Sequence, residues 1–484
     1  MEPDARREGL PFAPDLSGAA GHLMGSLHQQ LRGAILDGRL AAGATLPSSR
    51  ALAAELGVAR NTVTGAYDLL VAEGYITPRK GAKPVVADLH TRQRATPQVR
   101  SIEDPRLAPF WRTPWMPSPP RVLPERSFRL GVPDHRHFPH ALWRKLTAQA
   151  LQAFAKKPFS YPPSEGLPEL RAAIAQHVAF ARAVACTADD VIVTSGAQQA
   201  IDLLARMLIT PGETRVAVEE PGYPPVRATF AAAGAVLVPT RVDDEGLCVE
   251  CLPPGVRVIS VTPSHQSPTG AALSLRRRMA LLDYARAHDA VIIEDDYDGE
   301  FRFGSRPLDA LQTLDCEGRV FYIGTFTKSL FPALRKGFVV APAWARAPLV
   351  AVKHCTDSHG DAITQTVLAT FIREGHMARH VRKMRPIYAE RREAVLEGLA
   401  AMDEWMTPIP SEAGLHTAAR IRDPEQTTRI MALVREHTPG AQSSAEYAMA
   451  PPREPAIAFG YSVIDPDEIR VRMAALRAAL ARQA

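Results

Sequence analysis

The sequence predicts a two-part protein, in which a small helical unit is followed by a large α/β domain. The chain has 484 residues, 46% of them hydrophobic, which is enough for more than one compact core. Near the N-terminal end, hydrophobic residues recur at helical spacing in stretches that end at glycines. From about residue 165 onward, helical segments alternate with short β-branched runs. This alternation is typical of a largely parallel sheet covered by helices.

Composition indicates a reducing compartment. The first twenty residues mix both charge signs without an apolar signal-peptide core, and no later run approaches the roughly 18 apolar residues of a membrane span. We therefore expect a cytoplasmic protein with no membrane partner. The five cysteines form no disulfide framework, and the one C-x-x-C pair, Cys248 and Cys251, lacks a second pair, so we predict no bound metal. The net charge of +5 permits nucleic acid as a partner.

The N-terminal unit, assigned to residues 20–87, has the pattern of a helix-turn-helix. A first helix carries a hydrophobic stripe from Met24 to Ile35. A second helix is capped by Ser48, and Gly57 ends it in a tight turn that leads to a third helix. In a helix-turn-helix the second of the two joined helices enters the major groove by its N-terminal end. Two short strands around 75–77 and 84–86 then flank a basic wing.

Basic and polar side chains fall where such a unit meets DNA. Residues 1–87 carry nine Lys/Arg and eight Asp/Glu, a net charge of 9 − 8 = +1, so bulk charge alone favours no partner. The positions are more informative, because helix starts and the wing are where phosphates and base edges lie. The candidate DNA-binding residues are Arg50, Arg60, Asn61, Thr62, Thr64, Arg79, Lys80 and Lys83. The alternative is a helical cap with ordinary surface arginines.

Residues 88–127 are predicted to form a linker. Eight prolines interrupt regular structure there, and seven arginines stand against four acids. We expect a semi-stiff basic spacer, which either lies along DNA or keeps the chain soluble. Trp111 and Trp115 suggest that part of it docks on protein.

The large domain, residues 128–484, contains a run suited to bind pyridoxal phosphate. Lys328 has Thr325, Thr327 and Ser329 beside it, and Arg335 follows seven residues later. The amine of Lys328 can form a Schiff base with the aldehyde of this cofactor, while the hydroxyls and the guanidinium can bind its phosphate. The run alone is a weak signal, because most lysines are solvated surface residues.

Two motifs upstream strengthen this interpretation, since each follows a predicted strand and ligands of α/β sheets bind at the carboxyl ends of strands. Ser195, Gly196 and Ala197 open a helix whose backbone N–H groups can bind a phosphate. Tyr223, after the next strand, can lay its ring over the pyridine. Taken singly, a Ser-Gly turn and a packed turn tyrosine are both common.

The acidic run that follows Val291-Ile292-Ile293 is the most diagnostic motif. A carboxylate buried beside the pyridine nitrogen keeps that nitrogen protonated, and a nearby tyrosine hydroxyl can bond the ring O3′. Asp295 and Tyr297 fit these two roles. A solvated acidic loop is the alternative, which the apolar run directly before it disfavours.

These motifs resemble two known families in succession. Residues 46–76 (LPSSRALAAELGVARNTVTGAYDLLVAEGYI) are similar to the winged helix of GntR-type transcription regulators, except that Ala59 replaces the usual capping serine and the wing lacks Gly-Ser-Gly-Thr. Residues 128–484 resemble the fold-type I aminotransferases. The resemblance implies a mostly parallel sheet with helices on both faces and a smaller α+β subdomain.

Two further segments extend the resemblance. Tyr161, in YPPSEGLPELR, matches the tyrosine that reaches the phosphate of the partner subunit in that family, which implies a homodimer with shared sites. Residues 262–270 (TPSHQSPTG) correspond to the aminotransferase motif N-P-x-N-P-T-G, with Ser267 in place of the asparagine that bonds O3′. That Ser-His-Gln form behind a GntR-type winged helix is the pattern of the MocR family of regulators.

The MocR resemblance implies a transcription factor that binds double-stranded promoter DNA and senses a small amine or amino acid through pyridoxal phosphate on Lys328. An active aminotransferase with a DNA-binding fusion and a regulator that senses the cofactor itself are the alternatives. Against rapid transamination, the C-terminal run EPAIAFGYS (454–462) has no arginine where aminotransferases bind the substrate carboxylate. Possible substitutes are Arg227, Arg420 and Arg453, and the histidines of 134–143 either line the ligand entrance or lie at the surface.

Overall fold

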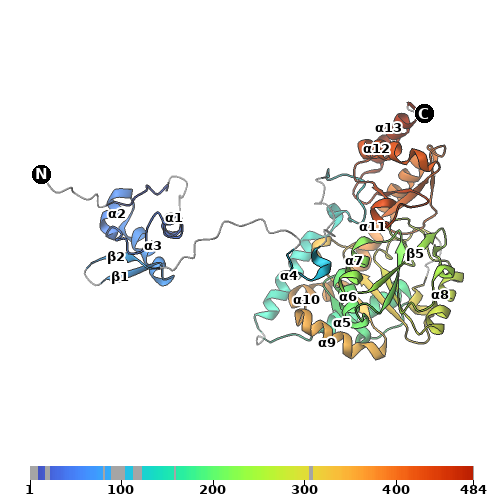
Figure 1. Cartoon of the computed structure of the whole chain (residues 1–484), viewed down its shortest axis with the longest axis horizontal. Coiled ribbons are helices and arrows are strands. Elements are labelled where there is room, and N and C mark those ends of the chain that lie inside the picture. The colour runs from blue at the N-terminus through green and yellow to red at the C-terminus, as the bar shows by residue number, and fades with distance from the viewer. Residues whose placement is uncertain are drawn as a thin grey trace. The chain divides into compact units, whose positions relative to one another are not determined.

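The computed structural model describes residues 9–16, 22–79, 82–88, 104–112, 123–156, 160–304 and 309–482. These residues form two compact units, one within Met1–Arg106 and the other within Leu107–Ala484. Helices and a two-stranded sheet make up the first unit, and the second is a large α/β domain (Figure 1). None of the helices in the described ranges has the length and apolar character needed to cross a membrane.

The smaller unit packs three helices against an antiparallel strand pair. Its elements are α1 (Leu23–Leu36), α2 (Ser49–Leu56), α3 (Arg60–Ala72), β1 (Ile76–Arg79) and β2 (Ala82–Val86). The hydrophobic stripes of the helices meet in one core, in which Leu31, Val63 and Leu70 are fully buried. The side chain of Ser48 accepts the N–H of Ala51, and Gly57 ends α2 at φ 66°. Ser48 thus fixes the start of α2, and Gly57 makes the tight connection from α2 to α3.

The central element of the larger unit is an eight-stranded sheet with the order β3-β10-β9-β8-β7-β4-β5-β6. The strands are β3 (Val191–Thr194), β4 (Arg215–Glu220), β5 (Val236–Asp243), β6 (Gly246–Leu247), β7 (Val258–Val261), β8 (Val291–Asp296), β9 (Val320–Thr325) and β10 (Gly337–Val340). Neighbours from β5 to β9 pair in parallel, whereas β10 runs antiparallel to β9 and β3, and β6 runs antiparallel to β5. The predicted α/β class is confirmed, and the sheet is mixed at two strands.

Helices cover both faces of this sheet. Successive residues of a strand point to opposite faces, so neighbouring residues show which helices lie on each side. In β9, Phe321 packs with α6, α7 and α9, whereas Tyr322 packs with α5, α10 and α11. The helices that precede the C-terminal region are α4 (His140–Phe154), α5 (Pro168–Arg182), α6 (Ala197–Leu208), α7 (Pro224–Ala232), α8 (Leu275–Ala287), α9 (Arg346–Asp357) and α10 (Ala362–Arg373). The runs of β3, β7, β8, β9 and β10 are therefore buried on both sides, whereas β5, nearer the edge of the sheet, is partly exposed.

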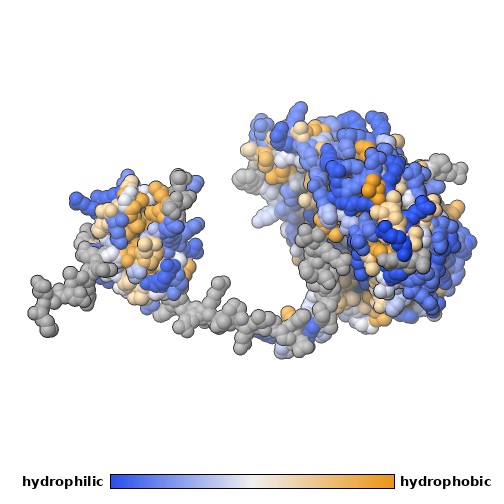
Figure 2. All heavy atoms as spheres, turned by 90° about the horizontal axis from the view of Figure 1, so that it is seen from above, coloured by the Kyte–Doolittle hydropathy of each residue, from blue (hydrophilic) through white to orange (hydrophobic). Residues whose placement is uncertain are grey.

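A smaller α+β subdomain follows at the C-terminal end. Its antiparallel sheet has the order β11-β12-β14-β13. The elements are α11 (His376–Ala400), β11 (Met406–Pro408), β12 (His416–Ile421), α12 (Thr427–His437), β13 (Gln442–Ser443), β14 (Ala456–Gly460) and α13 (Pro466–Arg482). The face of the large unit seen in Figure 2 is mostly hydrophilic, with hydrophobic residues in small patches.

Part of the predicted linker lies on the larger unit. Pro109–Arg112 forms a short 3-10 helix against α7, and Trp111 belongs to it with 45% of its surface exposed. Trp115 lies outside the described residues.

Candidate functional site

A cavity of about 320 Å³ lies at the edge where the parallel strands of the large sheet end. Loops that follow β4, β7, β8 and β9 surround it, together with the start of α6 and two segments of the C-terminal subdomain. Predicted cofactor residues that line it are Ala197, Tyr223, Asp295, Tyr297, Thr325, Thr327, Lys328 and Arg335. Residues up to 138 positions apart in the chain, from Ala197 to Arg335, therefore meet in one place.

Lys328 enters the cavity from the loop after β9. Its Nζ donates a hydrogen bond to the Gly131 carbonyl at 2.8 Å. Gly131 has φ 67°, which favours glycine, and a β-carbon there would lie 2.7 Å from the Lys328 Nζ and displace the amine from this position. Burial lowers the pKa of Lys328, and the carboxylates of Asp298 and Asp295 act against this shift. A lowered pKa favours the neutral amine, the form that attacks an aldehyde.

Asp295 has one buried carboxyl oxygen, Oδ1, without a hydrogen-bond partner among the described residues. The residue is 7% exposed. Burial, followed by the nearby charges of Asp296 and Glu219, raises its pKa to about 7. A buried carboxyl group in the lining of a cavity suits a protonated ring nitrogen, which can donate a hydrogen bond to it.

The opposite end of the cavity suits a phosphate. Arg335 lies at φ 47°, and its Nη2 donates to the Ser195 carbonyl at 2.9 Å, at the start of α6. Gly196, beside this guanidinium, has φ 85°, a backbone conformation that favours glycine. Thr325 and Thr327 lie beside it with their hydroxyl oxygens 3.0 Å apart. A guanidinium, two hydroxyls and a helix N-terminus together match the donors that a phosphate accepts.

The lysine, the buried acid and the donors that suit a phosphate match the chemistry of pyridoxal phosphate, and Lys328, Asp295 and Arg335 line the same cavity. The structure brings Ser195 and Gly196 to the edge of the cavity, beneath Arg335, without making them part of its lining. Tyr161 lies elsewhere: it is 88% exposed and contacts the ring of His359.

The Ser-His-Gln motif holds the strand ends of the site together. Ser264 accepts a 2.6 Å hydrogen bond from Arg182, which is also paired at 2.6 Å with Asp296. Gln266 is fully buried and donates its side-chain amide to Glu219 and to the Pro221 carbonyl. The loops after β4, β7 and β8 are thus joined by buried polar bonds, and this fixes where the side chains of the cavity point.

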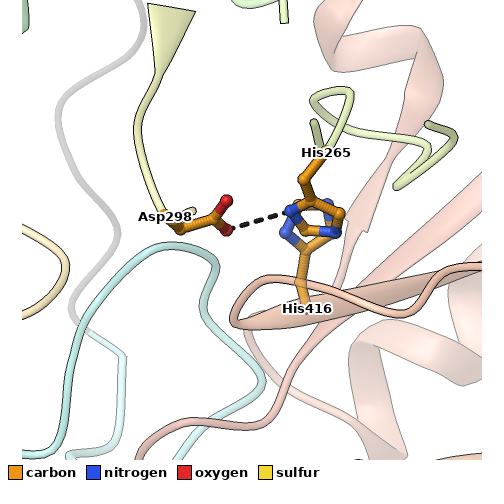
Figure 3. Close-up of side chains that lie close together, drawn as sticks. All are labelled: His265, Asp298 and His416. Carbon is orange, nitrogen blue, oxygen red and sulfur yellow. Dashed lines mark hydrogen bonds and ion pairs between the residues drawn. The ribbon is translucent and has the colours of Figure 1, made fainter. Parts of the chain in front are cut away.

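His265, the middle residue of this motif, contacts Asp298 and Tyr297. Its Nδ1 lies 2.9 Å from Asp298 Oδ2 (Figure 3) and 3.1 Å from the Tyr297 hydroxyl. Because a carboxylate only accepts, Nδ1 must carry the hydrogen, and then it cannot accept the hydroxyl proton of Tyr297. Burial and the Asp298 and Asp295 carboxylates raise the pKa of Tyr297 well above its ordinary value. Tyr297 therefore keeps a proton that is free to be donated into the cavity.

His416 lies beside His265, with ring centroids 4.3 Å apart and the ring planes tilted by 45°. His265, Asp298 and His416 each offer a metal-ligand atom, and these atoms lie within 4.8 Å of one another (Figure 3). His416 Nε2 is 3.1 Å from the Pro268 carbonyl and must donate to it, and burial lowers the pKa of His416 well below its ordinary value. Each of the three side chains makes a hydrogen bond, although the Nε2 of His265 is buried without a partner among the described residues. That the chain binds no metal stays a prediction.

Several residues of the cavity were not predicted. Gly131, Thr262, His416, Gln442 and Tyr447 line it. Thr262 is the first residue of the segment 262–270, in which it was assigned no role, and it donates its hydroxyl to Glu219 at 2.6 Å. The others come from distant parts of the chain, without a local pattern that marks a ligand site.

The three arginines considered as carboxylate binders lie away from this cavity. Arg227 donates to the carbonyls of Gly222, Tyr447 and Ala448. Arg420 is paired with Asp244 at 2.6 Å and with Glu454 at 3.0 Å. Arg453 and Arg420 line a separate cavity of about 650 Å³.

Among the described residues that line the Lys328 cavity, Arg335 is the one arginine, and the run 456–460 forms the buried strand β14. The histidines at 135, 137 and 140 are also absent from that lining.

In the smaller unit, the candidate DNA-binding residues lie on α2, α3 and the two strands. Arg50, Arg60, Asn61 and Arg79 are exposed, while Thr62, Thr64 and Lys83 are partly exposed. Thr64, Arg79 and Lys83 line one surface hollow of about 520 Å³ between α3 and the strands. The N-cap of α3 is Ala59, which makes no side-chain cap. Lys80 lies outside the described residues.

Comparison with known proteins finds a family match for each of the two units. Residues 23–85 match the bacterial regulatory proteins of the gntR family, and residues 129–484 match aminotransferase class I and II. The chain is 38% identical over 465 residues to the probable rhizopine catabolism regulatory protein MocR of Rhizobium meliloti, covering 94% of this chain and 92% of that protein. It is 38% identical over 404 residues to the HTH-type transcriptional regulator TauR of Rhodobacter capsulatus, covering 79% and 80%.

Solved structures match the larger unit. A kynurenine aminotransferase of Pyrococcus horikoshii aligns with a TM-score of 0.67 and 25% identity, covering 74% of this chain and 91% of that chain. The fold therefore defines a GntR-type helix-turn-helix regulator joined to a domain of the pyridoxal phosphate-dependent aminotransferase fold. The chain belongs to the MocR family of HTH-type transcriptional regulators.

Proposed function

We propose that the chain is a homodimeric promoter-binding regulator that holds pyridoxal phosphate through Lys328 and responds to a small amine or amino acid. When bound, the cofactor supplies an aldehyde that condenses with amines and a ring that withdraws electrons. Lys328 would bind the aldehyde carbon, Asp295 would hold a proton at the ring nitrogen, and Arg335 with the start of α6 would bind the phosphate. Bacterial promoter DNA lies in the cytoplasm, so the proposal also implies that location.

The observation that carries the regulatory proposal is the composition of the cavity. It has the groups needed to attach a cofactor, yet apart from Arg335 its described lining offers no guanidinium for a substrate carboxylate. Rapid transamination requires the substrate to be held in one orientation, and a displacement of about 1 Å can cost about a hundredfold in rate. An amine effector can therefore replace Lys328 at the cofactor without being turned over quickly.

The protein has two states in this proposal, one with Lys328 attached to the cofactor and one with the effector in its place. The contacts of Lys328 differ between them. Its free amine donates to the Gly131 carbonyl and is influenced by the Asp298 and Asp295 carboxylates, and these interactions change when the amine is attached to the cofactor. A ligand shifts a conformational equilibrium only by interacting differently with its two states. Lys328 provides such a difference directly.

Tyr161 supports the proposed homodimer. A tyrosine that is 88% exposed contributes nothing to the cavity of its own subunit. We expect it to reach the phosphate end of the partner's cavity, and in the smaller unit we expect Arg50, Arg60, Asn61, Thr62, Thr64, Arg79, Lys80 and Lys83 to contact DNA.

The test is a titration of the purified protein with candidate amines, followed by absorption spectra and by binding to a fragment of its own upstream DNA. The proposal predicts a visible absorption band that borohydride fixes on a Lys328 peptide and that changes with the effector. A protein that stays colourless with added cofactor contradicts it. An active aminotransferase would instead show fast keto-acid formation with no change in DNA binding.

A further inference from the structure

Two cysteines of the larger unit lie side by side, although neither contributes to the cofactor cavity. The Sγ atoms of Cys248 and Cys251 are 2.6 Å apart. A disulfide bond is about 2.05 Å long, so the pair needs to close by only about 0.6 Å. Cys251 is exposed and Cys248 is partly exposed, so small molecules can reach the pair from solvent.

The backbone holds this pair in place. Cys248 precedes the 3-10 helix Val249–Cys251, and the Cys251 N–H donates to the Cys248 carbonyl at 3.1 Å. The buried side chains of Val249 and Leu252 anchor the turn in the core under α8. The Cys248 N–H donates to the Arg241 carbonyl at 2.8 Å, which ties the turn to β5. Two thiols fixed at contact distance react with each other far faster than thiols on a flexible chain.

A metal site explains the pair poorly. A structural zinc ion takes four ligands. Within the described part of the chain, His265, Asp298 and His416 are the group of three or more metal-ligand side chains, and it contains neither cysteine. The nearby acid, Glu250, is already paired with Arg276 at 2.7 Å.

We propose that Cys248 and Cys251 form a reversible intramolecular disulfide by exchange with small-molecule disulfides. The thiolate of Cys251, the more exposed residue, attacks glutathione disulfide, which forms a mixed disulfide and releases one glutathione thiolate. The thiolate of Cys248 then attacks the Cys251 sulfur and releases the second glutathione. The two cysteines lose two electrons and two protons, and one glutathione disulfide is reduced to two thiols. In a reducing cytoplasm, disulfides of this kind are typically transient and redox-sensing.

The surroundings support these two roles. Burial, followed by the hydrogen bond and proximity of Cys251, raises the pKa of Cys248 to about 11. Cys248 is therefore protonated at neutral pH and poorly suited to make the first attack. Its sulfur nevertheless lies next to Cys251, where the resolving step requires it.

The experiment treats the full-length protein with excess glutathione disulfide, alkylates the remaining thiols and digests with trypsin. Residues 242–257 form one tryptic peptide that contains Cys248 and Cys251 and no other cysteine. We expect this peptide to lose two hydrogen atoms, to carry neither alkyl groups nor glutathione, and to return to the alkylated form after dithiothreitol. Cys316 and Cys355, which are exposed and have no cysteine neighbour, should instead carry glutathione or the alkyl group.

Variants separate the two steps. Cys248→Ser should leave a stable glutathione adduct on Cys251, and the untreated protein should keep its visible absorption band because the pair lies outside the cofactor cavity. The proposal is overturned if the wild-type peptide stays fully alkylated, or if it retains glutathione as Cys316 and Cys355 do. The wild-type measurement decides the matter even where a variant folds poorly.

Discussion

Replacing Asp295 with asparagine should stabilise the cofactor-free protein at alkaline pH, although it removes a residue that we assign to cofactor binding. The carboxyl is buried, its Oδ1 has no described partner, and its pKa is about 7 in the fold against an ordinary 3.8. Between these two pH values the folded chain holds a proton that the unfolded chain has released. The free energy of unfolding therefore falls as the pH rises through this window, and the whole loss is present above pH 7, where the buried carboxyl is ionised.

The size of the effect follows from the shift. A difference of about 3 pH units corresponds to about 4 kcal/mol, since one unit is about 1.4 kcal/mol. Asparagine removes that charge but leaves a buried amide without a partner, which costs about 1–3 kcal/mol. We therefore expect Asp295→Asn to gain about 1–3 kcal/mol at pH 8 and close to nothing at pH 5.

The adjacent residue is a matched control. Asp296 is also buried, but Arg182 lies 2.6 Å away and Tyr322 donates to it at 2.7 Å. Burial alone would raise the pKa of Asp296, and these partners nevertheless hold it below its ordinary value. Asp296→Asn breaks a buried ion pair and should cost about 3–5 kcal/mol.

Denaturant unfolding of the cofactor-free protein at pH 5 and pH 8, followed by a probe of the larger unit, measures both variants. The same Asp295→Asn change should weaken retention of the cofactor. If Asp295→Asn is less stable than the wild type at pH 8, the carboxyl is not a source of strain and the reasoning is refuted.

Three more predictions concern other parts of the two sites. His265→Leu should lower the free energy of unfolding by about 2–3 kcal/mol, because it removes the hydrogen-bond donor to Asp298. His265→Asn keeps a donor near the position of Nδ1 and should lower it by less than about 1 kcal/mol. Thermal unfolding compares the two variants, and equal losses of stability would contradict the assigned hydrogen bond. Arg335→Gln should weaken cofactor binding by about 2 kcal/mol in a spectroscopic titration, with unchanged affinity counting against a phosphate role. Arg50→Ala should weaken binding to all DNA sequences, whereas Arg60→Ala should also relax specificity at one base pair by about 1–3 kcal/mol. Mobility-shift assays with matched and mutated sites measure both effects, and unchanged binding of both variants would contradict the assigned DNA contacts.

The sequence was informative about this fold where a pattern is local. Runs such as VIVT at 191 and VFYIG at 320 are continuously apolar and buried on both faces, so these runs and their alternation with helical segments were enough to predict a covered sheet. The antiparallel direction of β10 was not predictable, because the run FVVA has the same composition as its parallel neighbours and direction depends on the connection.

The residues of the candidate site were likewise predictable only where they lie in a local motif. Lys328, Asp295 and Arg335 lie in motifs whose chemistry is readable from a few adjacent residues. Gln442 and Tyr447 reach the cavity only because the C-terminal subdomain folds against the large sheet. The role of Gln266 was hidden for a different reason: its partners, Glu219 and Pro221, are more than forty residues away in the chain.

The most direct test of the account measures keto-acid formation and DNA binding in the same titration with an amine effector, for the wild type and for Lys328→Ala. We predict that the amine changes DNA affinity of the wild type at concentrations where keto-acid formation is negligible. Lys328→Ala should bind DNA as the untreated wild type does and should not respond to the amine. Turnover at ordinary aminotransferase rates without any change in DNA affinity, or an undiminished response of Lys328→Ala, would contradict the claim that Lys328 couples ligand binding to DNA binding.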